Sequence, residues 1–86
     1  MVKQYGELYL ELRRALMAQE DPQTAGLMAR EVLSAFSGKS QEELLTHREL
    51  YAPEEVCQKV SRALRRLLMG EPLAYVLGEW DFYGLT

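Results

Sequence analysis

The single histidine and the single cysteine are the side chains best suited to covalent chemistry in this chain. An imidazole can activate a thiol, so His47 and Cys57 would form a nucleophilic pair if they met. Their separation in the sequence leaves open whether they meet, and no third group that would orient the imidazole can be identified. The simpler interpretation makes Cys57 a small helix residue near the core and puts His47 in a loop or at a helix end. One histidine and one cysteine cannot assemble a zinc site.

Paired carboxylates are the next candidates, because two acidic groups can share general acid–base work. Glu42 with Glu43, and Glu54 with Glu55, instead stand where helices are expected to begin, and a helix N-terminus favours negative charge. Neither G-x-G-x-x-G nor G-x-x-x-x-G-K-[ST], the loops that cradle phosphates, occurs in the sequence. We therefore expect no catalytic, cofactor-binding or metal-binding residue in this chain.

Basic side chains gather on two of the expected helices and could face an acidic partner surface. An alternative needs no partner: the helix macrodipole favours Arg65 and Arg66 near a C-terminus, and Lys59 can pair with Glu55 one turn earlier. The candidate partner contacts are Arg13 and Arg14 on the first helix, and Arg62 and Arg66 on the fourth.

The elements that must position these side chains are amphipathic helices with recognisable ends. Asp21 can cap a helix that has Pro22 in its first position, and Gly38 is a natural left-handed stop. Ser40 and Glu43 form a capping box. The predicted helices run from about residue 2 to 19, from 22 to 37, from 40 to 46 or 47, and from 53 to 69, followed by a helical turn that starts at residue 72 and stops at 78.

Apolar residues at helical spacing predict which side chains are buried. The predicted stripes are Tyr5, Leu8, Tyr9, Leu12 and Leu16 on the first helix; Ala25, Met28, Ala29, Val32, Ala35 and Phe36 on the second; and Val56, Val60, Ala63, Leu64 and Leu67 on the fourth.

Length and composition restrict the class of protein. At 86 residues, with 48% hydrophobic and 27% charged residues, the chain fits one small globular domain. A net charge of −3 argues against direct nucleic-acid binding. The N-terminus has no signal-peptide pattern, no apolar run could cross a membrane, and the lone cysteine cannot make an internal disulfide, so a cytoplasmic location is expected. The predicted fold is all-α, a small orthogonal bundle of four to five helices followed by the first strand of a hairpin.

The stretch "GEPLAYVLGEWDFYGLT" at residues 70–86 interrupts the helical pattern. Trp80 and Phe82 alternate with Asp81 and Tyr83 as in a strand, and Gly84 supplies a turn residue. A lone strand leaves its backbone groups unpaired, and no other segment looks like a partner.

The same stretch resembles the junction between the helical N-terminal domain and the catalytic domain in the HemK/PrmC family of release factor glutamine methyltransferases. The family pattern is a glycine, a short link, Pro-Leu-Ala-Tyr, an aliphatic pair, a glycine, a spacer, and then Phe with a small-residue turn. The matching positions here are Gly70, Pro72, Leu73, Ala74, Tyr75, Val76, Leu77, Gly78, Phe82, Gly84 and Leu85.

The resemblance implies that residues 1–78 are a helical substrate-recognition domain and that residues 79–86 begin a hairpin leading to a methyltransferase domain absent from this chain. Such enzymes bind S-adenosylmethionine there, and hold the substrate amide with an Asn-Pro-Pro-Tyr motif. This chain contains no asparagine, and its three prolines are isolated, so no catalytic residue carries over. The fragment alone is expected to be inactive and to end within the hairpin, where Trp80 and Phe82 belong to a strand whose partner is missing.

In the family, the helical domain helps to grip the release factor whose Gly-Gly-Gln tip enters the catalytic cleft. The resemblance therefore implies two partners for this domain, a peptide chain release factor and its own catalytic domain. Three alternatives remain open: a structural cap that never touches substrate, an independent adaptor that binds an amphipathic helix in a groove, and a helix-turn-helix DNA reader, which the acidic balance disfavours.

Overall fold

The computed structural model describes residues 2–78 of the chain, and within them the regular structure is helical. The fold is a small all-α bundle, as the sequence predicts. The expected strand at residues 79–86 lies outside the described residues. The helices are α1 (Tyr5–Leu16), α2 (Pro22–Ser37), α3 (Gln41–Thr46) and α4 (Glu54–Leu68), and a further helical turn spans residues 73–78.

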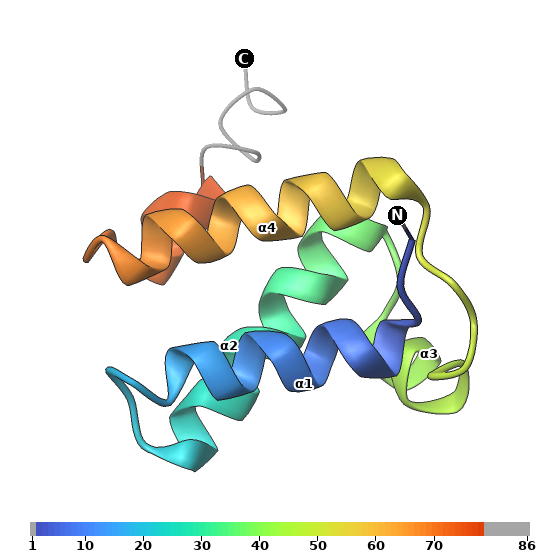
Figure 1. Cartoon of the computed structure of the whole chain (residues 1–86), viewed down its shortest axis with the longest axis horizontal. Helices are drawn as coiled ribbons and strands as arrows, with labels where there is room; N and C mark the ends of the chain where they lie inside the picture. Colours follow the sequence, from blue (N-terminus) through green and yellow to red (C-terminus); the bar gives the residue numbers. More distant parts are fainter. Residues whose placement is uncertain (1, 79–86) are drawn as a thin grey trace.

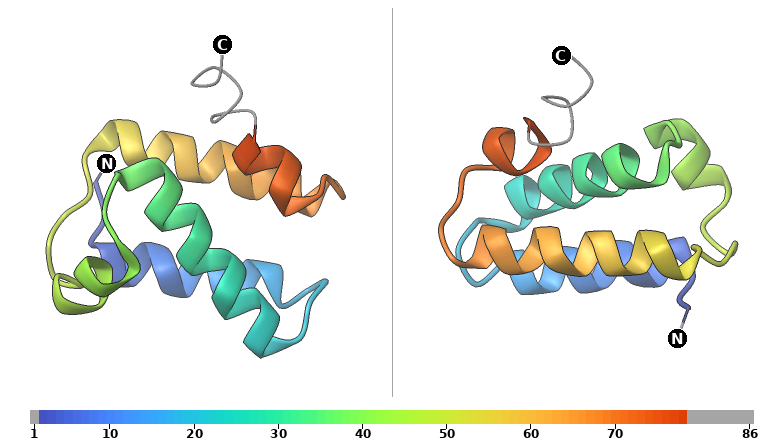
Figure 2. Two further views of the ribbon diagram at one scale, coloured as in Figure 1. Left: turned by 180° about the vertical axis from the view of Figure 1, so that it is seen from behind. Right: turned by 90° about the horizontal axis from the view of Figure 1, so that it is seen from above.

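Three helices form the body of the bundle (Figure 1). α1 and α4 run in the same direction, and α2 returns obliquely across both, packing most extensively on α1 (Figures 1 and 2). The short α3 lies at the end where α1 begins, and residues 70–78 fold back beside the C-terminal end of α4. No helix within residues 2–78 has both the length and the apolar character that crossing a bilayer requires.

The core of the described residues is entirely apolar, with no buried polar or charged residue. Burying one Leu or Val side chain contributes about 1.5–3 kcal/mol, so several stripes together offset the entropy of ordering a short chain. The largest side chains that are fully buried come from α1, α2 and the turn after α4, so that turn belongs to the core. They are Leu12, Leu16, Val32, Leu33 and Val76.

The helix ends confirm the local sequence signals. The Asp21 carboxylate accepts hydrogen bonds from the backbone N–H groups of Gln23 and Thr24, at 3.1 Å each, and Pro22 is the first residue of α2. Gly38 ends α2 with a φ of +75°, a conformation that side chains other than glycine rarely adopt. Ser40 and Glu43 form the predicted capping box of α3.

The predicted bounds of α1 are wrong at both ends, because the helix starts at Tyr5 and stops at Leu16. Its expected first residues instead run alongside the segment before α4. The Ala52 N–H donates to the Lys3 carbonyl at 2.8 Å, and the Tyr5 N–H donates to the Leu50 carbonyl at 2.9 Å. This pairing, which includes an isolated antiparallel bridge between residues 4 and 51, gives partners to N–H groups that a helix start leaves free.

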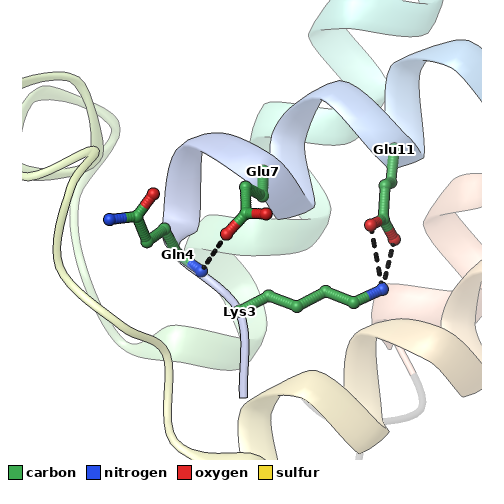
Figure 3. Close-up of polar contacts among 4 residues, drawn as sticks. All are labelled: Lys3, Gln4, Glu7 and Glu11. Carbon is green, nitrogen blue, oxygen red and sulfur yellow. Dashed lines mark hydrogen bonds and ion pairs between the residues drawn. The ribbon is translucent and has the colours of Figure 1, made fainter. Parts of the chain in front are cut away.

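Side chains also tie the N-terminal segment to α1 (Figure 3). The Gln4 N–H donates to the Glu7 carboxylate at 3.1 Å, completing a capping box, and the Lys3 ammonium contacts both carboxylate oxygens of Glu11 at 2.7 and 2.9 Å. These contacts hold the residues before Tyr5 in an extended conformation. The helix therefore does not reach back to residue 2, where the apolar pattern begins.

Burial on α2 and α4 differs from the predicted stripes at a few positions. Leu33 is buried although it was absent from the prediction, whereas Ala35 and Phe36 are only half-buried. α2 packs on both α1 and α4, so its apolar face is turned from the predicted one. Leu64 on α4 is likewise half-buried. At Gly26, α1 and α2 approach closely, since a Cβ added to this glycine would lie 3.0 Å from the Tyr9 hydroxyl.

The α2 cap predicts a specific pH dependence of stability. Hydrogen bonds from the Thr24 hydroxyl, at 2.6 Å, and from backbone N–H groups lower the pKa of Asp21 from its ordinary 3.8. A lowered folded-state pKa contributes stability that is present above the unfolded pKa and lost as the pH falls through the folded one. The Asp21→Asn variant keeps a cap acceptor without the ionisation.

Near neutral pH we expect Asp21→Asn to have a slightly lower melting temperature than the wild type, because the substitution removes a negative charge that the helix N-terminus favours. Between about pH 5 and about pH 2.5 the variant should lose less stability than the wild type, so the two curves converge. Parallel curves across that range would contradict this account of the cap.

Candidate partner-binding surface

The described residues bring together no catalytic centre. His47 is exposed at the end of α3, and Cys57 is half-buried on α4 with its thiol donating to the Ala52 carbonyl at 3.8 Å. That acceptor is a backbone oxygen and cannot serve as a catalytic base. No group of three or more His, Cys, Asp or Glu side chains within residues 2–78 could hold a metal ion.

The resolved pKa shifts are all explained by structural contacts. The Glu11 carboxylate raises the pKa of Lys3, and burial raises the pKa of Tyr5. Hydrogen bonds at the α3 cap, chiefly with the Ser40 backbone, lower the pKa of Glu43. Titrating groups in an active site are tuned for proton transfer, whereas these stabilise helix ends and the N-terminal segment.

The described residues form at least two hollows on the surface of the bundle. The larger, of about 610 Å³, lies between the start of α1, the middle of α2 and α3, and the smaller, of about 270 Å³, lies between α1 and α4. Exposed Leu10 and Leu45 line the larger hollow together with Arg30, Arg48 and Glu7. Side chains of both charges surround it, so it favours no particular charge in a ligand.

Two of the four candidate arginines make contacts within the domain. Arg13 is half-buried, and its Nε donates to the Pro22 carbonyl at 3.3 Å, which joins α1 to the start of α2. Arg66 donates from Nε and Nη2 to one carboxylate oxygen of Glu71, at 3.0 and 2.8 Å, and its guanidinium lies 5.9 Å from the centre of the Tyr75 ring. Both side chains hold parts of the domain together.

The other two candidates, Arg14 and Arg62, are exposed. Neither makes an ion pair or a side-chain hydrogen bond within residues 2–78, so both guanidiniums are available to a partner. Arg65, near the end of α4, has the same properties but is not among the four candidates. Its lack of an acidic neighbour one turn away is the sequence feature that could have identified it.

The junction motif is a packing element as far as the structure describes it. Gly70 has a φ of +101°, which reverses the chain after α4. Val76 enters the core, and Leu73 and Leu77 pack against it, while Tyr75 lies exposed over Arg66. Ala74 is exposed, and Gly78 is half-buried at the end of the helical turn. Phe82 and Gly84 lie outside the described residues.

Within residues 2–78 the fold defines a class of protein: a small all-α domain. Sequence comparisons are more specific, since the family model described as "PrmC N-terminal domain" matches residues 7–78. The chain therefore belongs to the PrmC N-terminal domain family, and the resemblance carried by the junction motif is confirmed.

Two named relatives agree with this assignment. The release factor glutamine methyltransferase of Neisseria gonorrhoeae is 41% identical over 56 residues, covering 65% of this chain and 20% of that protein. The release factor glutamine methyltransferase of Haemophilus influenzae is 34% identical over 70 residues, covering 80% of this chain and 24% of that protein. The chain thus matches at most about a quarter of the length of these relatives. No solved structure gives a significant match.

The Arg66 contacts predict a measurable coupling between α4 and the junction. Replacing Arg66 by Gln removes both hydrogen bonds to Glu71, and a partly buried bidentate pair of this kind contributes about 1 kcal/mol. We expect chemical denaturation of the 86-residue chain to register a lower free energy of unfolding for Arg66→Gln.

A double-mutant cycle with Glu71→Gln isolates the pair, and its coupling free energy should be about 0.5–1 kcal/mol. Arg62→Gln is the matched control, because Arg62 lies one turn earlier on α4 and is exposed, so the unfolding free energy of this variant should stay close to that of the wild type. A loss in Arg66→Gln no larger than in the control would show that the pair contributes nothing.

Proposed function

We propose that this domain recognises the substrate for a longer enzyme, an S-adenosylmethionine-dependent methyltransferase that modifies the glutamine of the Gly-Gly-Gln motif in peptide chain release factors. The observation that carries the proposal is the family match over residues 7–78, together with two relatives named for this modification. S-adenosylmethionine and the reacting amide would bind in a catalytic domain that forms the remainder of such an enzyme.

A physical argument supports a separate recognition domain. An amide nitrogen is a poor nucleophile, so holding it in position is a large part of catalysis. Binding energy from surfaces far from the reacting atoms can supply that positioning when the substrate is a folded protein. No polar or charged residue is buried among the described residues, and at least two exposed arginines have no partner in them, which suits a domain that binds rather than reacts.

A structural cap is the second candidate, and one observation favours it. Val76 of the junction is buried in the helical core and Leu73 and Leu77 pack beside it, so the domain anchors the chain at the point where the junction begins. A cap of this kind would stabilise the catalytic domain without touching the release factor.

Deleting residues 1–69 from the full-length enzyme separates the two candidates. If the domain recognises substrate, the KM for an intact release factor should rise about tenfold or more, equivalent to about 1.4 kcal/mol of binding free energy. The kcat/KM for a short peptide that contains Gly-Gly-Gln should stay unchanged, because the peptide never reaches the helical domain.

Methylation of the peptide also serves as the folding control in this experiment. An equal loss of activity toward peptide and protein would favour the structural cap. Unchanged kinetics with the intact release factor would contradict substrate recognition.

A further inference from the structure

The two halves of α4 carry opposite charge. Glu54 and Glu55 occupy its first turn, whereas Arg65 and Arg66 occupy its last. Four exposed side chains share the outer side of the second half, because the second lies three residues after the first, and the last two lie three and four residues after the second. We call this set the α4 basic face; it consists of Arg62, Arg65, Leu68 and Met69.

The positive charge of this face is not neutralised locally. Lys59 on the same helix contacts Glu55 one turn earlier at 3.2 Å. No acidic residue stands three or four positions from Arg62 or Arg65, since those positions hold Gln58, Lys59, Ser61, Arg66 and other residues without negative charge. Within residues 2–78 neither guanidinium makes an ion pair. Two adjacent unpaired cations on a chain of net charge −3 are therefore concentrated in one place.

The helix macrodipole does not explain the whole face. It favours cations within the last turn, which accounts for Arg65, but its effect has faded at Arg62. It also gives no reason for the apolar side chains beside them, of which Leu68 is 41% exposed and Met69 is 76% exposed. Arginine together with exposed apolar groups is the composition of a protein-binding site.

The position of the face adds to this argument. Residues 70–78 fold back beside the C-terminal end of α4 (Figure 2). The Arg66–Glu71 contact fixes them there. A protein bound on the α4 basic face would therefore also lie near residues 70–78. A substrate held by two domains has to contact the recognition domain in such a place.

We propose that the α4 basic face binds an acidic, partly apolar patch on the surface of the protein substrate. Carboxylates of the partner pair with Arg62 and Arg65, because a guanidinium offers a planar fork that matches a carboxylate. An apolar side chain of the partner packs on Leu68 and Met69, where the flexible thioether adapts to its shape. This assignment rests on the proposed function and names the surface that performs it.

The test compares variants of the full-length enzyme with intact release factor and with a Gly-Gly-Gln peptide as substrates. Arg62→Glu combined with Arg65→Glu should raise the KM for the release factor about tenfold, since two attractive pairs become repulsive. Added salt should raise the KM of the wild type by screening attraction, whereas in the double variant it should no longer raise the KM, since the same contacts are repulsive. Met69→Ala should raise the KM about threefold without changing its salt dependence.

Two controls guard against unfolding and against a general effect of charge. Arg48→Glu makes the same change at an exposed arginine in the loop between α3 and α4, at the opposite end of α4, and should leave the KM unchanged (Figure 1). If the double charge reversal lowers the melting temperature, the variant with Arg62→Gln and Arg65→Gln removes both positive charges without adding negative ones. It should still raise the KM about threefold.

The outcomes distinguish failure of this assignment from failure of the proposed function. If deletion of the domain raises the KM for the release factor but the α4 variants behave like Arg48→Glu, recognition stands and the face is wrongly assigned. If the α4 variants slow methylation of the peptide as much as that of the protein, the face packs on the catalytic domain, which overturns the inference. If neither deletion nor substitution changes the KM, both proposals fail.

Discussion

The structure depends on one constraint: helices this short cannot bury their apolar stripes alone, so each must cover another. α2 satisfies the constraint by crossing both α1 and α4, and the turn after α4 adds Val76 to the same core. The resulting interior is wholly apolar within the described residues, and every charged side chain there is left at or near the surface. A domain built in this way presents stable helix faces to its surroundings.

The junction connects this packing to function. Gly70 reverses the chain, Arg66 holds Glu71, and the Tyr75 ring lies beside the same guanidinium. Together with burial of Val76, these contacts fix the direction of the chain up to residue 78. A recognition surface can position a substrate only if it is itself held in place, because loose attachment would lose the advantage of binding. The motif at residues 70–78 is thus explained by the packing and hydrogen bonds that fix the chain direction, without any contact with a ligand.

The sequence predicted those features that depend on neighbouring residues. The caps at Asp21 and Ser40 and the stop at Gly38 were all correct, because each is a hydrogen bond or dihedral preference within a few positions. The bounds of α1 failed because Lys3 pairs with Ala52, a contact between segments far apart in the chain. The same distinction between local and distant contacts applies to the candidate arginines. Arg62 is exposed and makes no ion pair within residues 2–78, whereas Arg66 has an acidic partner five residues away across a turn, which helix spacing does not predict.

The central claim is that the outer face of α4 meets the substrate, and methionine methyl groups report on it directly. The chain has four methionines, of which Met69 is 76% exposed on this face while Met28 is half-buried on α2. In the full-length enzyme with labelled methionine methyl groups, titration with an intact release factor should shift or broaden the Met69 signal and leave Met28 unchanged. A Met69 signal that stays unchanged while the enzyme becomes saturated with release factor would contradict the account.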